Sequence, residues 1–174
     1  MLTLADFYEQ MVKEYLEQQG FTVRLCVRFF KTRGYSDIDV LAVNLTEGKA
    51  IVGEVKASSF TNKKIDDEKN DFNDPKLQDK VKELIGDKPY SKYIFCWSVE
   101  DSTKKYALEK YQITVVQFWE IINHFIERVK ESRGKGKWIY DQTFPNTMLL
   151  QLLYHFSESY KGKVRVDLSK LHHP

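Results

Sequence analysis

Three charged residues lie in two short apolar segments of the sequence. Asp39 precedes the run Val-Leu-Ala-Val, and Glu54 and Lys56 follow the run Ala-Ile-Val-Gly. Such segments are typical of buried strands, where a charge is unfavourable unless a partner neutralises it. A divalent cation between the two carboxylates would neutralise them and could also take part in catalysis. The alternative is an exposed hairpin with ordinary salt bridges to Lys56 or Arg24, but the apolar flanks of both segments favour burial.

Strand geometry predicts that these side chains converge. Residues two apart on a strand point to the same face, which groups Glu54 with Lys56 and Asp37 with Asp39. A hairpin turn at the intervening Glu-Gly dipeptide would place Asp39 level with Val55, within one residue. The two carboxylates and the lysine would then meet at one end of a sheet.

This set of side chains suits hydrolysis of a phosphate ester. Mg²⁺ is commonly bound through one or two carboxylates, keeping waters and substrate phosphate oxygens as its other ligands. A bound metal would polarise the phosphate and lower the pKa of a bound water. Lys56 could orient that water or stabilise the charge that develops on the phosphate. Asp37 competes with Asp39 for the metal, and we favour Asp39 because it leads directly into the apolar run.

Hydrophobic periodicity and turn residues predict the elements that must position the site. The order is α-β-β-β-α-β-α-β-α, followed by a basic loop and a helical tail. This order indicates an α/β fold with a mixed central sheet flanked by helices and a helical C-terminal extension. We expect a helix from Leu4 to before Gly20, strands Phe21–Phe30, Asp37–Asn44 and Ala50–Lys56, a polar loop Ser58–Asp74, a helix Pro75–Ile85, a strand Tyr90–Trp97, a helix Asp101–Tyr111, a strand Ile113–Val116, and helices Phe118–Val129 and Thr147–Tyr160.

Composition narrows the class of protein. The chain has 174 residues and a net charge of +2, so any affinity for nucleic acid must come from a local basic patch. Cys26 and Cys96 lie in strand-like segments, and we expect both to be buried free thiols of a reducing compartment. No apolar run is long enough to span a membrane, and the N-terminus does not have the pattern of a signal peptide. We therefore expect a cytoplasmic protein.

The two strands and the first helix resemble the PD-(D/E)xK nuclease superfamily. The matching residues are Gly34-Tyr-Ser-Asp-Ile-Asp39-Val-Leu-Ala and Gly53-Glu-Val-Lys56, together with the helical pattern from Glu9 to Gly20. The resemblance covers about the first hundred residues and is closest to the archaeal Holliday-junction-resolvase-like and Mrr-like restriction branches. It implies a restriction-endonuclease-like core. Ile38 stands where the family pattern has its proline.

The resemblance also implies roles for individual residues. Asp39, Glu54 and the Val55 carbonyl would bind Mg²⁺ or Mn²⁺, and Lys56 would be the catalytic lysine. Glu9 would approach the same metal from the first helix. In several branches a glutamine or lysine of the next helix also faces the site, which makes Gln78 a candidate for substrate binding, although solvent exposure of Gln78 and of Lys82 is the favoured alternative.

Basic residues suggest where a nucleic acid could bind. Arg28, Lys31 and Arg33 precede the carboxylates in the chain and could contact phosphates, although a solvated turn is an equal alternative. A second basic run between Arg128 and Lys137 could contact a DNA backbone or be a solvated loop. We expect a nuclease-like domain at 1–130 and an extension of unknown role at 131–174.

The sequence therefore predicts a Mg²⁺-dependent endodeoxyribonuclease that attacks the phosphodiester with a metal-activated water. Its partner would be DNA, and a homodimer is expected because cutting two strands needs two sites. The alternative is a non-catalytic module with the nuclease fold that binds DNA or a protein. Metal binding distinguishes the two.

Overall fold

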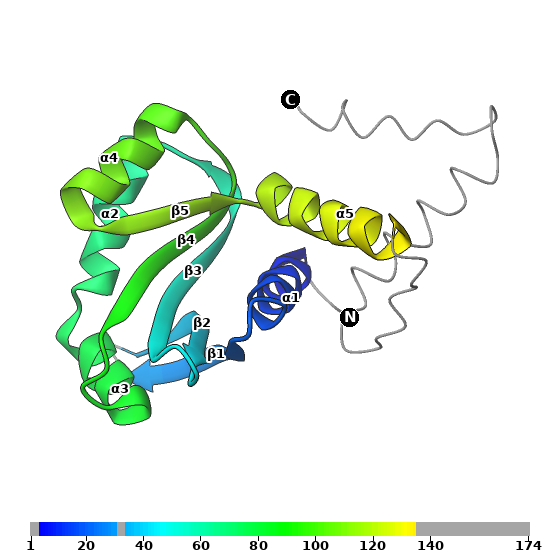
Figure 1. The fold of residues 1–174 in the computed structure, drawn as a ribbon. Coiled ribbons are helices and arrows are strands. Elements are labelled where there is room, and N and C mark those ends of the chain that lie inside the picture. The colour runs from blue at the N-terminus through cyan, green and yellow to red at the C-terminus, as the bar shows by residue number, and fades with distance from the viewer. Residues whose placement is uncertain (1–3, 31–33, 135–174) are drawn as a thin grey trace. The chain divides into compact units, whose positions relative to one another are not determined.

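A five-stranded mixed sheet is the centre of the fold. In the computed structural model, residues 4–30 and 34–134 are described, and they contain five helices and five strands. The strands lie in sequential order across the sheet: β1 (Thr22–Phe30), β2 (Tyr35–Asn44), β3 (Lys49–Phe60), β4 (Tyr90–Val99) and β5 (Ile113–Gln117) (Figure 1). The α/β architecture with a mixed sheet, predicted from the sequence, is confirmed.

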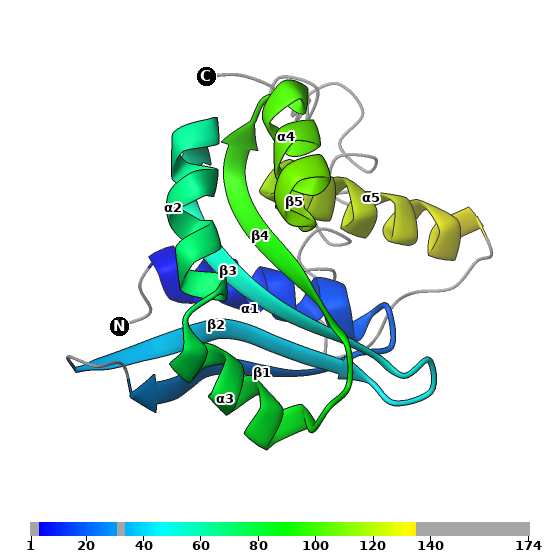
Figure 2. The same ribbon diagram turned by 90° about the vertical axis from the view of Figure 1, so that its left-hand side faces the viewer.

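The sheet changes from antiparallel to parallel at β3. β1, β2 and β3 form an antiparallel meander, whereas β3–β4 and β4–β5 pair in parallel. Parallel neighbours need a crossover connection. Helices α2 (Asn62–Phe72) and α3 (Pro75–Ile85) connect β3 to β4, and α4 (Asp101–Tyr111) connects β4 to β5 (Figure 2).

Helices cover both faces of the sheet. Helix α1 (Leu4–Glu17) lies against β1, β2 and β3 with Met11, Val12 and Leu16 buried. The other face packs against α2, α3 and α4, where one hydrophobic cluster joins sheet residues to buried side chains of all three helices. In Figure 1, α1 lies on the opposite side of the sheet from α2, α3 and α4. β3 is therefore covered on both faces, which explains its apolar sequence.

The polar segment 58–74 is not a loop, and this prediction is wrong. β3 continues to Phe60, and α2 follows from Asn62 to Phe72. Charged residues dominate α2, but Ile65 and Phe72 are completely buried. These two residues are seven apart and fall on the same helical face. Two apolar anchors are enough to dock a short helix whose remaining surface faces solvent or other polar groups.

The other described elements agree with the sequence predictions within a few residues. The bounds of α3 and α4 are as predicted, and α3 is capped by the Asp74 carboxylate, which accepts a bond from the Lys76 N–H at 2.8 Å. The predicted helix Thr147–Tyr160 lies outside the described residues.

The chain divides into two compact units at residue 118. The first unit is Met1–Phe118, and α5 (Phe118–Gly134) enters the second at Trp119. Ile121, Phe125 and Val129, four residues apart, form the buried face of α5. None of the described helices is long and apolar enough to cross a membrane.

Candidate active site

Asp39 lies where β2 and β3 begin to separate. Val40 and Gly53 form the last antiparallel pair between the two strands. One residue further along, the Asp39 carboxylate accepts a hydrogen bond at 2.7 Å from the backbone N–H of Val55. The side chain thus replaces a backbone partner that the diverging strands no longer supply. The predicted juxtaposition of Asp39 with Val55 is present in the structure.

The same hydrogen bond fixes the direction of the Val55 carbonyl. The N–H and C=O groups of one strand residue point toward the same neighbouring strand. Because the Val55 N–H points to Asp39, its carbonyl oxygen is directed to that side as well. This is the orientation that a backbone metal ligand beside Asp39 requires.

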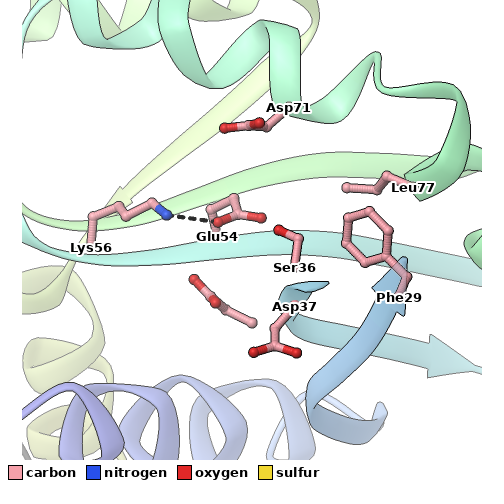
Figure 3. Close-up of a pocket in the computed structure, with 8 residues that line it drawn as sticks. Phe29, Ser36, Asp37, Glu54, Lys56, Asp71 and Leu77 are labelled. Carbon is pink, nitrogen blue, oxygen red and sulfur yellow. Dashed lines mark hydrogen bonds and ion pairs between the residues drawn. The ribbon is translucent and has the colours of Figure 1, made fainter. Parts of the chain in front are cut away.

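Glu54 and Lys56 lie on the face of β3 that α2 and α3 cover. Lys56 Nζ donates to Glu54 Oε2 at 2.8 Å, and Glu54 is only 6% exposed. Together with Asp39 they line a cavity of about 330 Å³ (Figure 3). The remaining lining residues are Phe29, Ser36, Asp37, Asp71 and Leu77.

Burial and the negative charge of Asp39 both destabilise the ionised form of Glu54. Burial, and to a smaller extent the Asp39 carboxylate, raise the pKa of Glu54 to about 7, and the Lys56 ammonium only partly opposes them. Burial alone would lower the pKa of Lys56, but the Glu54 carboxylate outweighs it and raises that pKa. The lysine therefore stays charged, and the cavity retains more carboxylate than it can neutralise.

Helix α2 brings two further carboxylates that the sequence analysis missed. Glu68 Oε1 lies 3.8 Å from Lys56 Nζ, and burial raises the pKa of Glu68. Asp71 lines the cavity and, in Figure 3, points toward Glu54 from the helix above. Both were assigned to a loop because segment 58–74 is so polar. The seven-residue spacing of Ile65 and Phe72 was the signal that could have placed them on a helix facing the sheet.

Glu9 approaches the site from the other face of the sheet. Its carboxylate accepts a hydrogen bond from Cys26 Sγ at 3.0 Å, and it is not among the residues that line the cavity. Burial raises the pKa of Glu9, and the negative charge of Asp39 adds to this effect. Glu9 is therefore close enough to Asp39 to sense its charge, although Cys26 is its immediate partner.

Cys26 is exposed, so the prediction of a buried thiol is wrong for this residue, whereas Cys96 is buried as predicted. The backbone of Cys26 has φ +52°, a left-handed conformation that is rare in a strand. This backbone conformation interrupts the alternation of side chains between the two faces of β1. The Cys26 side chain therefore faces Glu9 and not the core. The hydrogen bond to Glu9 raises the pKa of the thiol to about 12.

The predicted substrate-binding residues are only partly described. Arg28 is exposed beside the cavity, with its Nε 3.7 Å from Asp37 Oδ1. Gln78 is exposed on α3 and does not line the cavity. Lys31, Arg33 and the stretch 135–137 lie outside the described residues.

The donor set fits a hard divalent cation. Within residues 4–30 and 34–134, no three His, Cys, Asp or Glu side chains are grouped closely enough to form a metal site by themselves. Mg²⁺, however, commonly binds through one or two carboxylates and completes its shell with water and substrate oxygens. Asp39, Glu54 and the Val55 carbonyl provide such a partial set, and burial together with the Asp39 carboxylate raises the pKa of Glu54.

Comparisons with known proteins give no functional assignment. No family model matches the chain, and no curated protein matches it. A crystal structure of a protein of unknown function, AF1548, superposes with a TM-score of 0.48 at 20% sequence identity. The match covers 64% of this chain and 57% of that protein, so the chain spans little more than half of its length.

Proposed function

We propose that this protein is a metal-dependent nuclease with a restriction-endonuclease-like core, which hydrolyses DNA phosphodiester bonds with a metal-activated water. One observation supports the proposal most strongly. Two carboxylates and a lysine, Asp39, Glu54 and Lys56, line one cavity at the point where β2 and β3 separate. This set is the one that the resemblance to PD-(D/E)xK nucleases singles out.

The charge of the cavity argues for a required cation. Asp37, Asp39, Glu54 and Asp71 line it, with Lys56 as the only cation among the lining residues that the structure describes. A phosphodiester is itself an anion and would be repelled from such a cavity. A divalent ion held by Asp39, Glu54 and the Val55 carbonyl would reverse this repulsion, polarise the phosphate and lower the pKa of a bound water.

Lys56 has a role that no carboxylate can supply. Its ammonium group donates to Glu54 and lies within 3.8 Å of Glu68. This hydrogen bond and this ion pair hold a flexible side chain over the cavity, so little conformational entropy remains to be lost when a substrate binds. In this position the ammonium can orient the attacking water and stabilise the negative charge that develops on the phosphate.

Glu9 supports the site from outside the cavity. It is the α1 residue that senses the charge of Asp39, and its hydrogen bond with Cys26 holds α1 to β1 beside that carboxylate. A contribution of Glu9 to the metal would be through a water molecule or through release of the Cys26 thiol. The proposal therefore assigns Asp39 and Glu54 as the principal ligands.

The test is cleavage of DNA by the full chain with and without Mg²⁺. Lys56→Ala and Glu54→Ala should abolish cleavage, whereas Lys49→Ala, at the other end of the same strand, should leave it unchanged. Circular dichroism checks that each variant is folded. Wild-type cleavage by either Lys56→Ala or Glu54→Ala would refute the assignment.

A metal-binding measurement separates an enzyme from a binding module. Wild-type protein should bind Mg²⁺ or Mn²⁺ at millimolar concentration or more tightly, and Asp39→Asn should weaken this binding by tenfold or more. A folded protein that binds DNA but neither metal would instead be the non-catalytic module.

A further inference from the structure

Two aromatic side chains project from the end of the β1–β2 hairpin nearest the cavity. Phe30 and Tyr35 are cross-strand partners, and their ring centroids lie 4.0 Å apart with an interplanar angle of 44°. Phe30 is 63% exposed and Tyr35 is 68% exposed. The rings thus contact each other while most of their surface remains open to solvent.

The pair is continuous with the candidate active site. Their neighbours Phe29 and Ser36 line the cavity from the opposite face of the two strands, and Asp37, which lies on the same face as the rings, lines it too. Arg28 and Asp37 form the next cross-strand pair on the same face as the aromatic rings. The pairs on either side, Leu25 with Val40 and Val27 with Ile38, place Cys26 and Asp39 at the next position, although these two residues are not themselves paired in the ladder. A row of side chains therefore leads from the aromatic pair, past an exposed guanidinium, to a proposed metal ligand.

The chemistry of this row matches a nucleic acid strand. Aromatic faces stack on unpaired bases of any sequence, because every base has a π face. Arg28 is 80% exposed at its side chain and can contact a phosphate next to such a base. Bases inside an intact duplex are stacked on both faces and offer none to the aromatic pair, whereas unpaired bases do.

We propose that Phe30 and Tyr35 stack on unpaired bases, so that the substrate is DNA in which a single-stranded segment adjoins a duplex. The inference rests on the proposed nuclease function and adds the substrate class. Tyr35 and Asp39 are four residues apart on β2. At a rise of about 3.3 Å per residue this is about 13 Å. In double-stranded DNA each strand advances about 3.4 Å per nucleotide, so cleavage should occur in the duplex part, about four nucleotides from the stacked base.

The first experiment measures stacking without cleavage. Single-stranded DNA that carries 2-aminopurine is titrated with the full-length protein in EDTA, and fluorescence quenching reports base stacking. Loss of one base–aromatic stack is worth about 1–3 kcal/mol, so Phe30→Ala or Tyr35→Ala should weaken binding about 5- to 150-fold. Phe30→Leu, which retains apolar surface, should also weaken it. The matched control Leu45→Ala removes an exposed apolar residue of the turn that follows the other end of β2, and it should bind as wild type does.

The second experiment measures cleavage of fork and blunt duplex DNA in Mg²⁺. Wild-type protein should cut the fork in preference, about four nucleotides from the branch, and the two alanine variants should lose the preference while Lys56→Ala loses all cleavage. Equal single-strand binding by the wild type and both alanine variants would overturn the inference and leave the nuclease assignment standing. Stacking that is lost in the variants, without cleavage by any protein, would support recognition of unpaired bases and refute the nuclease.

Discussion

The electrostatic strain at Glu54 predicts an unusual dependence of stability on pH in the metal-free protein. A carboxyl group whose pKa is raised in the folded state binds its proton more tightly there than in the unfolded chain. The folded state is then favoured as pH falls, and stability is lost as pH rises toward the folded-state pKa. Glu54, with its pKa raised to about 7 by burial and by Asp39, belongs to this class.

The magnitude follows from the two pKa values. One pKa unit corresponds to about 1.4 kcal/mol, so a rise from 4.5 to about 7 is equivalent to about 3 kcal/mol. Most of this, roughly 2–3 kcal/mol, should be lost between about pH 5 and pH 8. Burial raises the pKa values of Glu9 and Glu68 as well, so these residues add losses of the same sign.

Comparison with Glu54→Gln isolates the contribution of Glu54. Urea unfolding in EDTA, followed by tryptophan fluorescence, gives the free energy of unfolding of both proteins at several values between about pH 5 and pH 8. The wild-type value should fall by about 2–3 kcal/mol more than the variant value over this range. Any constant difference caused by the lost bond to Lys56 cancels, because only the pH dependence is compared.

Saturating Mg²⁺ provides the second half of the experiment. A cation beside Glu54 stabilises the ionised carboxylate, so the wild-type pH dependence should flatten while that of Glu54→Gln stays the same. Parallel curves for the two proteins in EDTA would refute the electrostatic reasoning. A wild-type curve that Mg²⁺ does not alter would refute metal binding by Glu54.

Two further substitutions test the packing that positions the site. Gly53→Ala would place a Cβ atom 2.9 Å from Cε2 of the fully buried Phe95, so unfolding in urea should show a loss of about 1–3 kcal/mol; a loss below about 0.5 kcal/mol would mean that Phe95 can move. Phe72→Ala removes a completely buried side chain that anchors α2, and it should lower the free energy of unfolding by about 3–5 kcal/mol. A variant as stable as the wild type would show that α2 docks by other contacts.

Local sequence patterns predicted most of the fold. Helices with a regular apolar stripe, such as α3, and strands with apolar runs, such as β2, were placed within a few residues of their observed bounds. The prediction of secondary structure failed for segment 58–74, where only a few apolar residues pack a polar helix against the sheet. In α2 only Ile65 and Phe72 are buried among many charges, so the average hydrophobicity of the segment indicated solvent exposure.

In the candidate site, too, local sequence patterns predicted some positions and missed others. The alternation of strand side chains placed Glu54 and Lys56 on one face, and the spacing of the hairpin brought Asp39 to Val55. The contact of Glu68 with Lys56, and the position of Asp71 at the cavity, depended on a crossover helix that strand periodicity does not describe. The exposure of Cys26 depended on a left-handed backbone at one residue, which has no signal in a pattern of residue types.

By itself, the sequence determined the α/β architecture and the convergence of Asp39, Glu54 and Lys56, because alternation along neighbouring strands is a local property of the chain. The tertiary structure alone decided the electrostatic state of these groups. The desolvation of Glu54, the retention of the Lys56 charge and the approach of α2 depend on atoms far apart in the chain, and burial of charge is a property of the assembled core. For the same reason, only the fold placed the exposed Phe30–Tyr35 pair in line with Asp39, and this arrangement points to the DNA that the site is proposed to cut.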